Sequence, residues 1–135
     1  MRPELDLRLY LVTDRGLAGG RDLLDVVLAA VAGGATIVRL REKEAPTRDV
    51  LALARELKAR IRVPLIINDR VDVALASGAD GVHVGQSDMP YADARAIMGP
   101  DAVIGLSVES IEDAEVAEAL DADYLGLSPV YTTPT

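Results

Sequence analysis

The chain has 135 residues, of which 50% are hydrophobic and 27% are charged. That length suits a single domain with a buried core, and the apolar content excludes an intrinsically disordered protein. The net charge of −8 argues against a non-specific nucleic-acid binder, and the absence of cysteine excludes disulfides and thiolate metal sites.

No apolar run reaches membrane-spanning length, and the N-terminus lacks the charged and then apolar pattern of a secretory signal. We therefore expect a cytoplasmic protein with neither a membrane nor a nucleic acid as partner. Phenylalanine and tryptophan are absent. The core is therefore predicted to consist of aliphatic strands covered by alanine-rich helices, as in close-packed α/β proteins.

Strand-like and helix-like segments alternate along the chain, and this order predicts βαβ units with a parallel sheet. The apolar runs predict strands over residues 7–13, 36–40, 64–68, 81–84, 103–107 and 124–127. Helical spacing of apolar residues predicts helices over residues 22–32, 47–60, 70–77, 91–98 and 111–120.

A repeat accompanies this alternation. Ala35-Thr36, Ala79-Asp80 and Ala122-Asp123 each lie between a helix end and a strand start, 44 and 43 residues apart. Each interval holds two strands and two helices, and four such modules would close a (β/α)8 TIM barrel. We therefore predict an α/β fold in which residues 1–135 form one domain. It would be the N-terminal three-quarters of a barrel, with about six of eight βα units; an open doubly wound sheet is the alternative.

Polar residues follow the predicted strands where the carboxyl ends of parallel strands share one rim. Arg41 and Lys43 stand two residues apart after an extended run, so their side chains point to the same side. Two cations on a concave rim suit a phosphate or a pyrophosphate. Ordinary surface charge is the alternative interpretation of this pair.

Asn68-Asp69 and Asp88 follow two other predicted strands. Each aspartate is placed to cap the helix that comes next. The alternative is that Asp69 and Asp88 share one Mg²⁺, which often takes only one or two carboxylates from a protein and completes its shell with diphosphate oxygens. Two cations and two acids on one rim fit a metal–diphosphate site better than either pair alone.

His83 and Ser107 each have a structural interpretation. His83 lies inside a strand between two valines, so we expect a hydrogen-bonded interior imidazole. Ser107 ends the fifth strand, where a turn serine is the ordinary role. No nucleophile is positioned for a catalytic triad, and no glycine-rich nucleotide-binding loop occurs.

The chain resembles the thiamine-phosphate synthase family, also called thiamine-phosphate pyrophosphorylase, in collinear motifs that cover nearly its whole length. Its close tautomerase relatives share much of this set. The motifs are LYLVTD at 9–14, VRLREK at 38–43, LIINDRVDVA at 65–74, GADGVHVGQSD at 78–88, IGLS at 104–107 and ADYLGLSPVYTTPT at 122–135.

The resemblance implies a (β/α)8 barrel with small-molecule substrates, which joins hydroxymethylpyrimidine diphosphate to a thiazole phosphate and releases pyrophosphate, with Mg²⁺ as cofactor. In this family the diphosphate ionises first, and the thiazole nitrogen then captures the pyrimidine carbocation. The resemblance also assigns the site residues. Arg41, Lys43 and Ser107 would be catalytic; Arg39, Arg41, Lys43, Asn68, Ser107, Thr133 and Thr135 would bind substrate; Asp69 and Asp88 would bind the metal.

Three departures from the family pattern stand out. Arg39 replaces a glutamine that contacts the pyrimidine, and a cation there suits the diphosphate or Glu42 better than a carbocation. Glu109 stands where the family often has histidine. The family's Thr-x-Thr is followed by a pyrophosphate-binding lysine, whereas the sequence stops at Thr135. We therefore expect the 135-residue form to be inactive or very weak by itself.

Two alternatives stay open. One is a thiazole tautomerase of the same superfamily, which has no diphosphate to ionise. The other is a non-catalytic truncated barrel module that forms a homo-oligomer through its unpaired edge strands.

Overall fold

The computed structural model describes residues 2–134, which form a single six-stranded parallel sheet with strand order β1-β2-β3-β4-β5-β6. The strands are β1 (Tyr10–Val12), β2 (Ile37–Leu40), β3 (Leu65–Asn68), β4 (Gly81–Val84), β5 (Val103–Val108) and β6 (Tyr124–Leu127). The helices between them are α1 (Leu23–Ala32), α2 (Thr47–Arg60), α3 (Val71–Ser77), α4 (Tyr91–Met98) and α5 (Ile111–Ala119).

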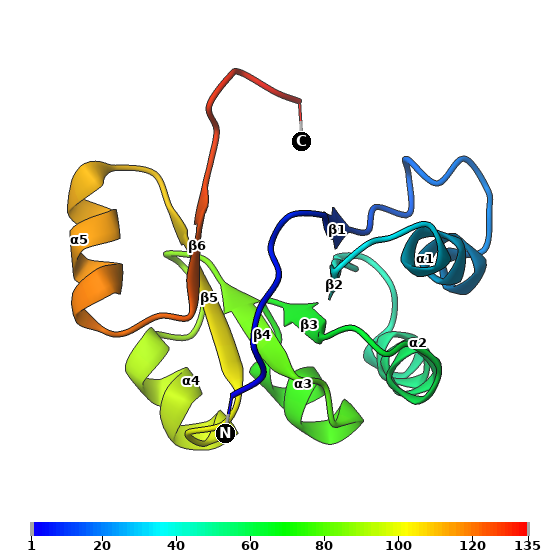
Figure 1. Cartoon of the computed structure of the whole chain (residues 1–135), viewed down its shortest axis with the longest axis horizontal. Coiled ribbons are helices and arrows are strands. Elements are labelled where there is room, and N and C mark those ends of the chain that lie inside the picture. The colour runs from blue at the N-terminus through cyan, green and yellow to red at the C-terminus, as the bar shows by residue number, and fades with distance from the viewer. Residues whose placement is uncertain (1, 135) are drawn as a thin grey trace.

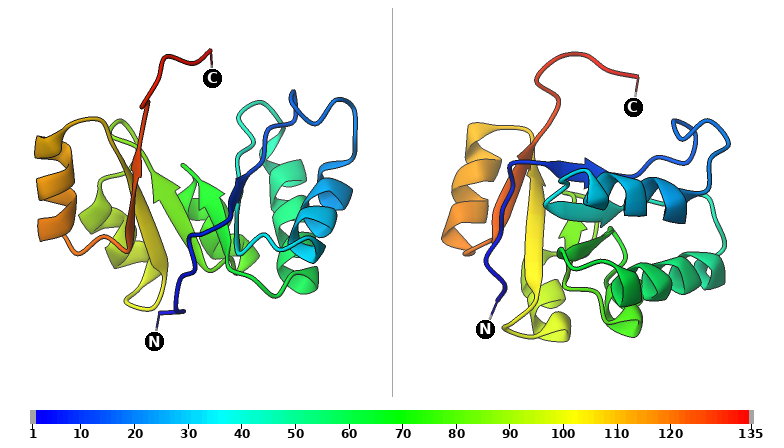
Figure 2. Two further views of the ribbon diagram at one scale, coloured as in Figure 1. Left: turned by 45° about the horizontal axis from the view of Figure 1, so that its top comes forward. Right: turned by 45° about the vertical axis from the view of Figure 1, so that its right-hand side comes forward.

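The sheet is curled, with the five helices along its outer side (Figure 1). A doubly wound sheet reverses its strand order at a switch point, whereas here every strand pairs with the next one in sequence. The doubly wound alternative is therefore wrong. The described residues form an open half-barrel with β1 and β6 at its edges (Figure 2), and they do not form the full eight-unit ring.

The predicted elements lie within a few residues of the observed ones. The largest difference is β1, which spans three residues instead of the predicted 7–13, because only Tyr10–Val12 pair with β2. Among residues 2–134, none of the helices combines the length and the apolar character that a membrane crossing requires.

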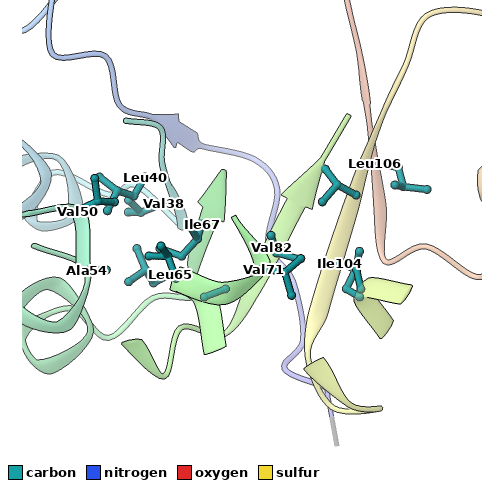
Figure 3. Close-up of a cluster of buried hydrophobic side chains, with 14 of the residues drawn as sticks. Val38, Leu40, Val50, Ala54, Leu65, Ile67, Val71, Val82, Ile104 and Leu106 are labelled. Atoms are coloured by element: carbon teal, nitrogen blue, oxygen red, sulfur yellow. The ribbon is translucent and has the colours of Figure 1, made fainter. Parts of the chain in front are cut away.

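Side chains alternate between the two faces of the sheet. The outer face carries aliphatic residues that pack against the helices, among them Val38, Leu65, Val82 and Ile104 (Figure 3). The inner face holds a second, smaller cluster built on Ile37, Ile66, Val103 and Tyr124. Beyond this cluster, one inward position toward the carboxyl end of each of β2, β3, β4 and β5 is polar: Arg39, Asn68, His83 and Ser107.

The sequence repeat has a structural role at the amino-terminal ends of the strands. Its polar members, Thr36, Asp80 and Asp123, each bond the backbone near the start of the preceding strand. Thr36 Oγ1 accepts from Leu9 N at 3.1 Å, Asp80 Oδ2 from Leu65 N at 2.8 Å, and Asp123 Oδ2 from Ile104 N at 2.7 Å. One residue of each module therefore ties two neighbouring strands together at the amino-terminal end of the sheet, opposite the rim.

Asp123 has the most partners of the three. Its carboxylate, 10% exposed, accepts from Arg2 at 2.8 Å and from Arg95 at 3.0 Å in addition to the Ile104 amide. The Arg2–Asp123 contact ties the N-terminal segment to the start of β6, at the amino-terminal end of the half-barrel. Removing this carboxylate would leave the Ile104 amide and one nitrogen of each guanidinium without this acceptor, although both guanidinium groups also donate to backbone carbonyls.

We predict that Asp123→Ala lowers the free energy of unfolding by about 3 kcal/mol, because it breaks a largely buried ion pair from one side. Urea denaturation followed by circular dichroism measures the change. Glu56→Ala is the matched control, since Glu56 pairs with Arg60 on the exposed face of α2 and its loss should change stability by less than about 0.5 kcal/mol. Equal effects of the two substitutions would contradict the proposed role of Asp123.

Candidate functional site

The loops that follow β1 and β2 enclose an open cleft of about 640 Å³ at the carboxyl end of the sheet. This is the rim at which the predicted site residues were expected to meet. Its lining consists of Asp14, Arg15, Gly16, Arg41, Glu42, Lys43, Glu44 and Ala45.

Arg41 is fixed at this rim by β1. Its backbone N–H donates to Thr13 Oγ1 at 3.0 Å, and its guanidinium lies 3.4 Å from Asp14 Oδ2. The long ion-pair distance leaves most of the guanidinium's donors free for a ligand in the cleft. Arg41 therefore lies where the sequence placed it.

Glu42 is committed to another cation. Arg15 donates to Glu42 Oε2 through Nε at 2.8 Å and through Nη2 at 2.6 Å, and the Glu42 side chain is only 5% exposed. This pair joins the loop after β1 to the loop after β2. The suggestion that Arg39 faces Glu42 is therefore wrong, because the partner of Glu42 is Arg15.

Lys43 is exposed and has no ion pair within residues 2–134. Burial raises the pKa of Asp69, and the positive charges of Lys43 and Arg39 oppose this rise in part, so both cations lie within electrostatic range of that carboxyl group. Basic residues from β2 and the loop after it therefore converge on the end of β3.

Asp69 and Asp88 do not cap helices, so that interpretation was wrong for both. The residue before α3 is Arg70, the residue before α4 is Pro90, and neither helix has a side-chain cap. Asp69 instead occupies a left-handed conformation with φ of 66°, and Arg70 N bonds back to Asn68 O at 2.8 Å. Such a tight, strained turn turns the chain sharply where β3 ends.

Asp88 is held by its own loop, since its Oδ2 accepts from Gly85 N at 2.7 Å. Burial first, and then the neighbouring Asp88 carboxyl, raise the pKa of Asp69. The ionised form of Asp69 is therefore disfavoured unless a cation lies beside it.

The donor set at this position fits Mg²⁺, which prefers carboxylate oxygens and needs few of them from the protein. No group of three or more His, Cys, Asp or Glu side chains suited to a metal occurs within the described part of the chain. A cation held by Asp69 and Asp88 would therefore take its remaining ligands from water or substrate.

Below the rim, the concave face carries a connected polar chain. His83, 2% exposed, contacts Tyr124 Oη through Nδ1 at 2.9 Å and Ser107 Oγ through Nε2 at 2.7 Å. The Tyr124 hydroxyl is also hydrogen-bonded to the Tyr10 hydroxyl. The interior, hydrogen-bonded imidazole expected at His83 is confirmed, and Ser107 lies within β5 and not in a turn.

Small residues make room for this chain. A Cβ atom on Gly105 would overlap the Tyr124 ring, and one on Gly126 would lie 3.2 Å from His83 Cε1. Burial and the nearby Arg39 charge lower the pKa of His83 to about 3, so the imidazole is neutral at pH 7. Burial raises the pKa of both Tyr10 and Tyr124, so both hydroxyl groups keep their protons.

Arg39 points into the concave face, with its guanidinium carbon 5.6 Å from the centre of the Tyr10 ring. Its buried Nε has no hydrogen-bond partner within residues 2–134. A buried donor of this kind is costly unless a ligand or water accepts from it. Arg39 therefore has a donor available at the inner end of the site.

Three predicted site residues remain to be placed. Asn68 is partly exposed at the end of β3, directly beside His83 in the sheet register. Thr133 is exposed in the segment that extends past β6 and bends over the rim toward β1 (Figures 1 and 2). Thr135 lies outside the described residues.

Sequence reasoning did not assign roles to Tyr10, Tyr124 or Asp14. Two of the four tyrosines lie at inward positions of β1 and β6, the first and last strands, and their contact depends on the curl of the sheet. The sequence could have indicated a role for both tyrosines, because each lies in a predicted strand at a position that faces inward. Asp14 follows β1 directly, in the same way as the other rim residues follow their strands.

The curled parallel sheet, with basic and acidic side chains and a free donor at its carboxyl rim, defines an α/β half-barrel protein. A family model for thiamine monophosphate synthase matches residues 9–135, so the chain belongs to the thiamine monophosphate synthase family.

Similar proteins agree with this membership. The chain is 58% identical to a thiamine-phosphate synthase of Solidesulfovibrio magneticus over 138 aligned positions, which cover 100% of the chain and 65% of that relative. It is also 58% identical to one of Albidiferax ferrireducens, with 96% and 60% covered. The chain thus spans less than two thirds of the length of these relatives.

Solved structures confirm the fold. The thiamine phosphate pyrophosphorylase of Pyrococcus furiosus superposes with a TM-score of 0.84 at 42% identity, covering 94% of the chain and 62% of that protein. A thiamine phosphate pyrophosphorylase of Bacteroides thetaiotaomicron matches with a TM-score of 0.63 at 19% identity, which supports the fold alone.

We predict that Asp69→Asn stabilises the protein at pH 7 when no divalent cation is present. The raised pKa of Asp69 in the folded state means that wild-type stability is lost as pH rises through it, and asparagine removes that loss while tolerating a positive φ. Urea denaturation in EDTA should give a gain that shrinks as the pH falls toward the ordinary range of an aspartate.

Asp121→Asn is the matched control for this prediction. Asp121 is the other non-glycine residue with a positive φ, 62°, but its side chain is exposed. A gain of equal size at Asp121 would mean that the effect comes from the backbone and not from the paired carboxyl groups.

Proposed function

We propose that this chain supplies most of the active site of a thiamine-phosphate synthase. The reaction joins hydroxymethylpyrimidine diphosphate to thiazole phosphate and releases pyrophosphate. The observation that carries the proposal is the convergence of Arg41 and Lys43 with Asp69 and Asp88 on one rim. The relatives that bear this enzyme name support it. A cytoplasmic location and self-association stay predictions.

The chemistry requires stabilisation of a leaving group more than proton transfer. The bond between the pyrimidine methylene carbon and the diphosphate oxygen breaks, and both electrons leave with the pyrophosphate. The lone pair of the thiazole nitrogen then forms the new carbon–nitrogen bond. Because charge builds on the departing oxygens, pre-positioned cations lower the barrier more than they strengthen ground-state binding.

Each residue has a part in this scheme. Arg41 and Lys43 bind the diphosphate from the β2 side, and Asn68 and Ser107 donate hydrogen bonds from β3 and β5. The family resemblance assigns Thr133 and Thr135 to substrate binding. Arg39, with its buried free donor, binds the substrate at the inner end of the site.

Asp69 and Asp88 would hold Mg²⁺ at the end of β3 and β4. A bound Mg²⁺ neutralises negative charge on the diphosphate. The two carboxyl groups contribute by fixing its position, and their mutual repulsion is relieved when a cation separates them.

Pyrophosphate release tests the function directly. It is measured from the pyrimidine diphosphate with thiazole phosphate and Mg²⁺, for the 135-residue chain and for a chimera that continues into the C-terminal third of the Solidesulfovibrio magneticus relative. Activity of the chimera, with the shorter chain weak or silent, is the expected result. Silence of both, together with thiazole tautomerisation, would assign the chain to the tautomerase branch.

Within the active form, Arg41→Ala should lower kcat by about 100- to 1000-fold, while the KM for thiazole phosphate changes little, because Arg41 acts on the leaving group. Arg62→Ala is the matched control, since it removes the same charge from the opposite end of the sheet, before β3. An unchanged kcat in Arg41→Ala would contradict the role given to Arg41.

Mg²⁺ should raise the thermal unfolding midpoint of the wild-type chain in a saturable way, since a ligand that binds only the folded state stabilises it. Asp69→Asn and Asp88→Asn should each remove most of this response. Glu56→Gln, on the exposed face of α2, should retain it. A full Mg²⁺ response in both aspartate variants would place the cation elsewhere.

A further inference from the structure

The polar chain on the concave face joins four side chains from four different strands. Tyr10 lies on β1, Tyr124 on β6, His83 on β4 and Ser107 on β5. We propose that Tyr10, Tyr124 and His83 each donate a hydrogen bond toward the rim, so that Ser107 presents its hydroxyl proton to an anionic ligand oxygen.

The geometry permits two directions for the hydrogen bonds that join these four side chains. In one, Tyr10 donates to Tyr124, Tyr124 donates to His83 Nδ1, and His83 Nε2–H donates to Ser107 Oγ. In the other, every proton points the opposite way, and Ser107 donates to His83 Nε2. The distances of 2.9 Å and 2.7 Å at the two imidazole nitrogens are compatible with both. A neutral imidazole carries one donor and one acceptor, so the choice at one nitrogen fixes the other.

Tyr10 decides between the two directions. Among residues 2–134 its hydroxyl has the Tyr124 hydroxyl and the Arg39 guanidinium as hydrogen-bonding neighbours, and a guanidinium can only donate. If Tyr124 donated to Tyr10, the Tyr10 proton would lie half-buried beside a cation, with no acceptor. An unsatisfied buried donor is costly, so the chain is expected to begin at Tyr10 and to run outward.

With the hydrogen bonds running from Tyr10 toward the rim, the Ser107 hydroxyl is the one donor of these four side chains that has no acceptor among them. Ser107 accepts from His83, and its own hydroxyl proton is then directed toward the partly exposed end of the strand. A hydroxyl that already accepts one hydrogen bond has its proton free, and that proton is a suitable donor to a phosphate oxygen. Tyr124 and His83 are in this sense positioning residues, because they act through Ser107.

The identity of the anion rests on the proposed function, whereas the direction of the hydrogen bonds does not. If the protein is a synthase, the oxygen that accepts the Ser107 hydroxyl proton belongs to the diphosphate. A donor directed at that oxygen would strengthen its bond as negative charge accumulates there.

The first test is the tautomer of His83, the one histidine of the sequence. In ¹⁵N-labelled wild-type protein at pH 7, long-range ¹H–¹⁵N correlation spectra report which imidazole nitrogen carries the proton. A protonated Nε2 and an unprotonated Nδ1 are expected. A protonated Nδ1, or averaged signals from both tautomers, would overturn the proposal without any variant.

Tyr124→Phe tests whether Tyr124 is the donor to the imidazole. Removing its hydroxyl should shift the Nδ1 resonance toward that of a nitrogen that accepts no hydrogen bond. Tyr131→Phe is the matched control, because Tyr131 is 86% exposed and its loss should leave the imidazole signals unchanged. An unchanged Nδ1 shift in Tyr124→Phe would overturn the role given to Tyr124.

A double-mutant cycle tests whether the effect reaches the rim. Pyrophosphate binding in the presence of Mg²⁺, measured by calorimetry, should weaken about 2- to 10-fold in Tyr124→Phe, the size of one neutral hydrogen bond. In the Ser107→Ala background, Tyr124→Phe should have no further effect. Equal weakening in both backgrounds, or no pyrophosphate binding by the wild type, would overturn the presentation of Ser107 to an anion.

These outcomes separate the inference from the proposed function. The imidazole spectra are recorded on the free chain and do not depend on turnover. An Nε2–H tautomer together with a silent synthase assay of the chimera would refute the function and leave the hydrogen-bond direction standing. An active chimera together with a protonated Nδ1 would refute the direction alone.

Discussion

The alternation of side chains along six parallel strands is the constraint on which the rest of the structure depends. One face of each strand must be aliphatic to pack against the helices, as Val38, Val82 and Ile104 do. The other face lines a concave surface that curls until the first and last strands approach each other. Polar groups on that face can be satisfied only by partners from other strands, which is why Tyr10 meets Tyr124.

The two ends of the sheet differ in how completely their charged side chains are paired. At the amino-terminal ends, Asp80 and Asp123 bond the backbone of neighbouring strands and neutralise basic side chains. At the carboxyl ends, the carboxyl groups of Asp69 and Asp88 oppose each other, and Lys43 has no ion pair among the described residues. The unpaired charges at the rim are therefore the ones that the proposed function assigns to a cation and a diphosphate.

Much of the site could be predicted from residue order alone. Arg41, Lys43, Asp69 and Asp88 were assigned to one rim because parallel strands place their carboxyl ends at a common edge. The roles of the two aspartates as helix caps could not be excluded from sequence, since a cap and a ligand need the same residue type at the same place. The positive φ at Asp69 and the loop bond to Asp88 decided against capping.

The sequence by itself determined the alternation of elements, the parallel sheet and the candidate rim residues, because these follow from local periodicity and from strand direction. Only the tertiary structure decided which side chains touch. Glu42 pairs with Arg15 and not with Arg39, and His83 bridges Tyr124 and Ser107. Such contacts join residues 24 to 41 positions apart, and they depend on the curl and register of the sheet, which local sequence patterns do not encode.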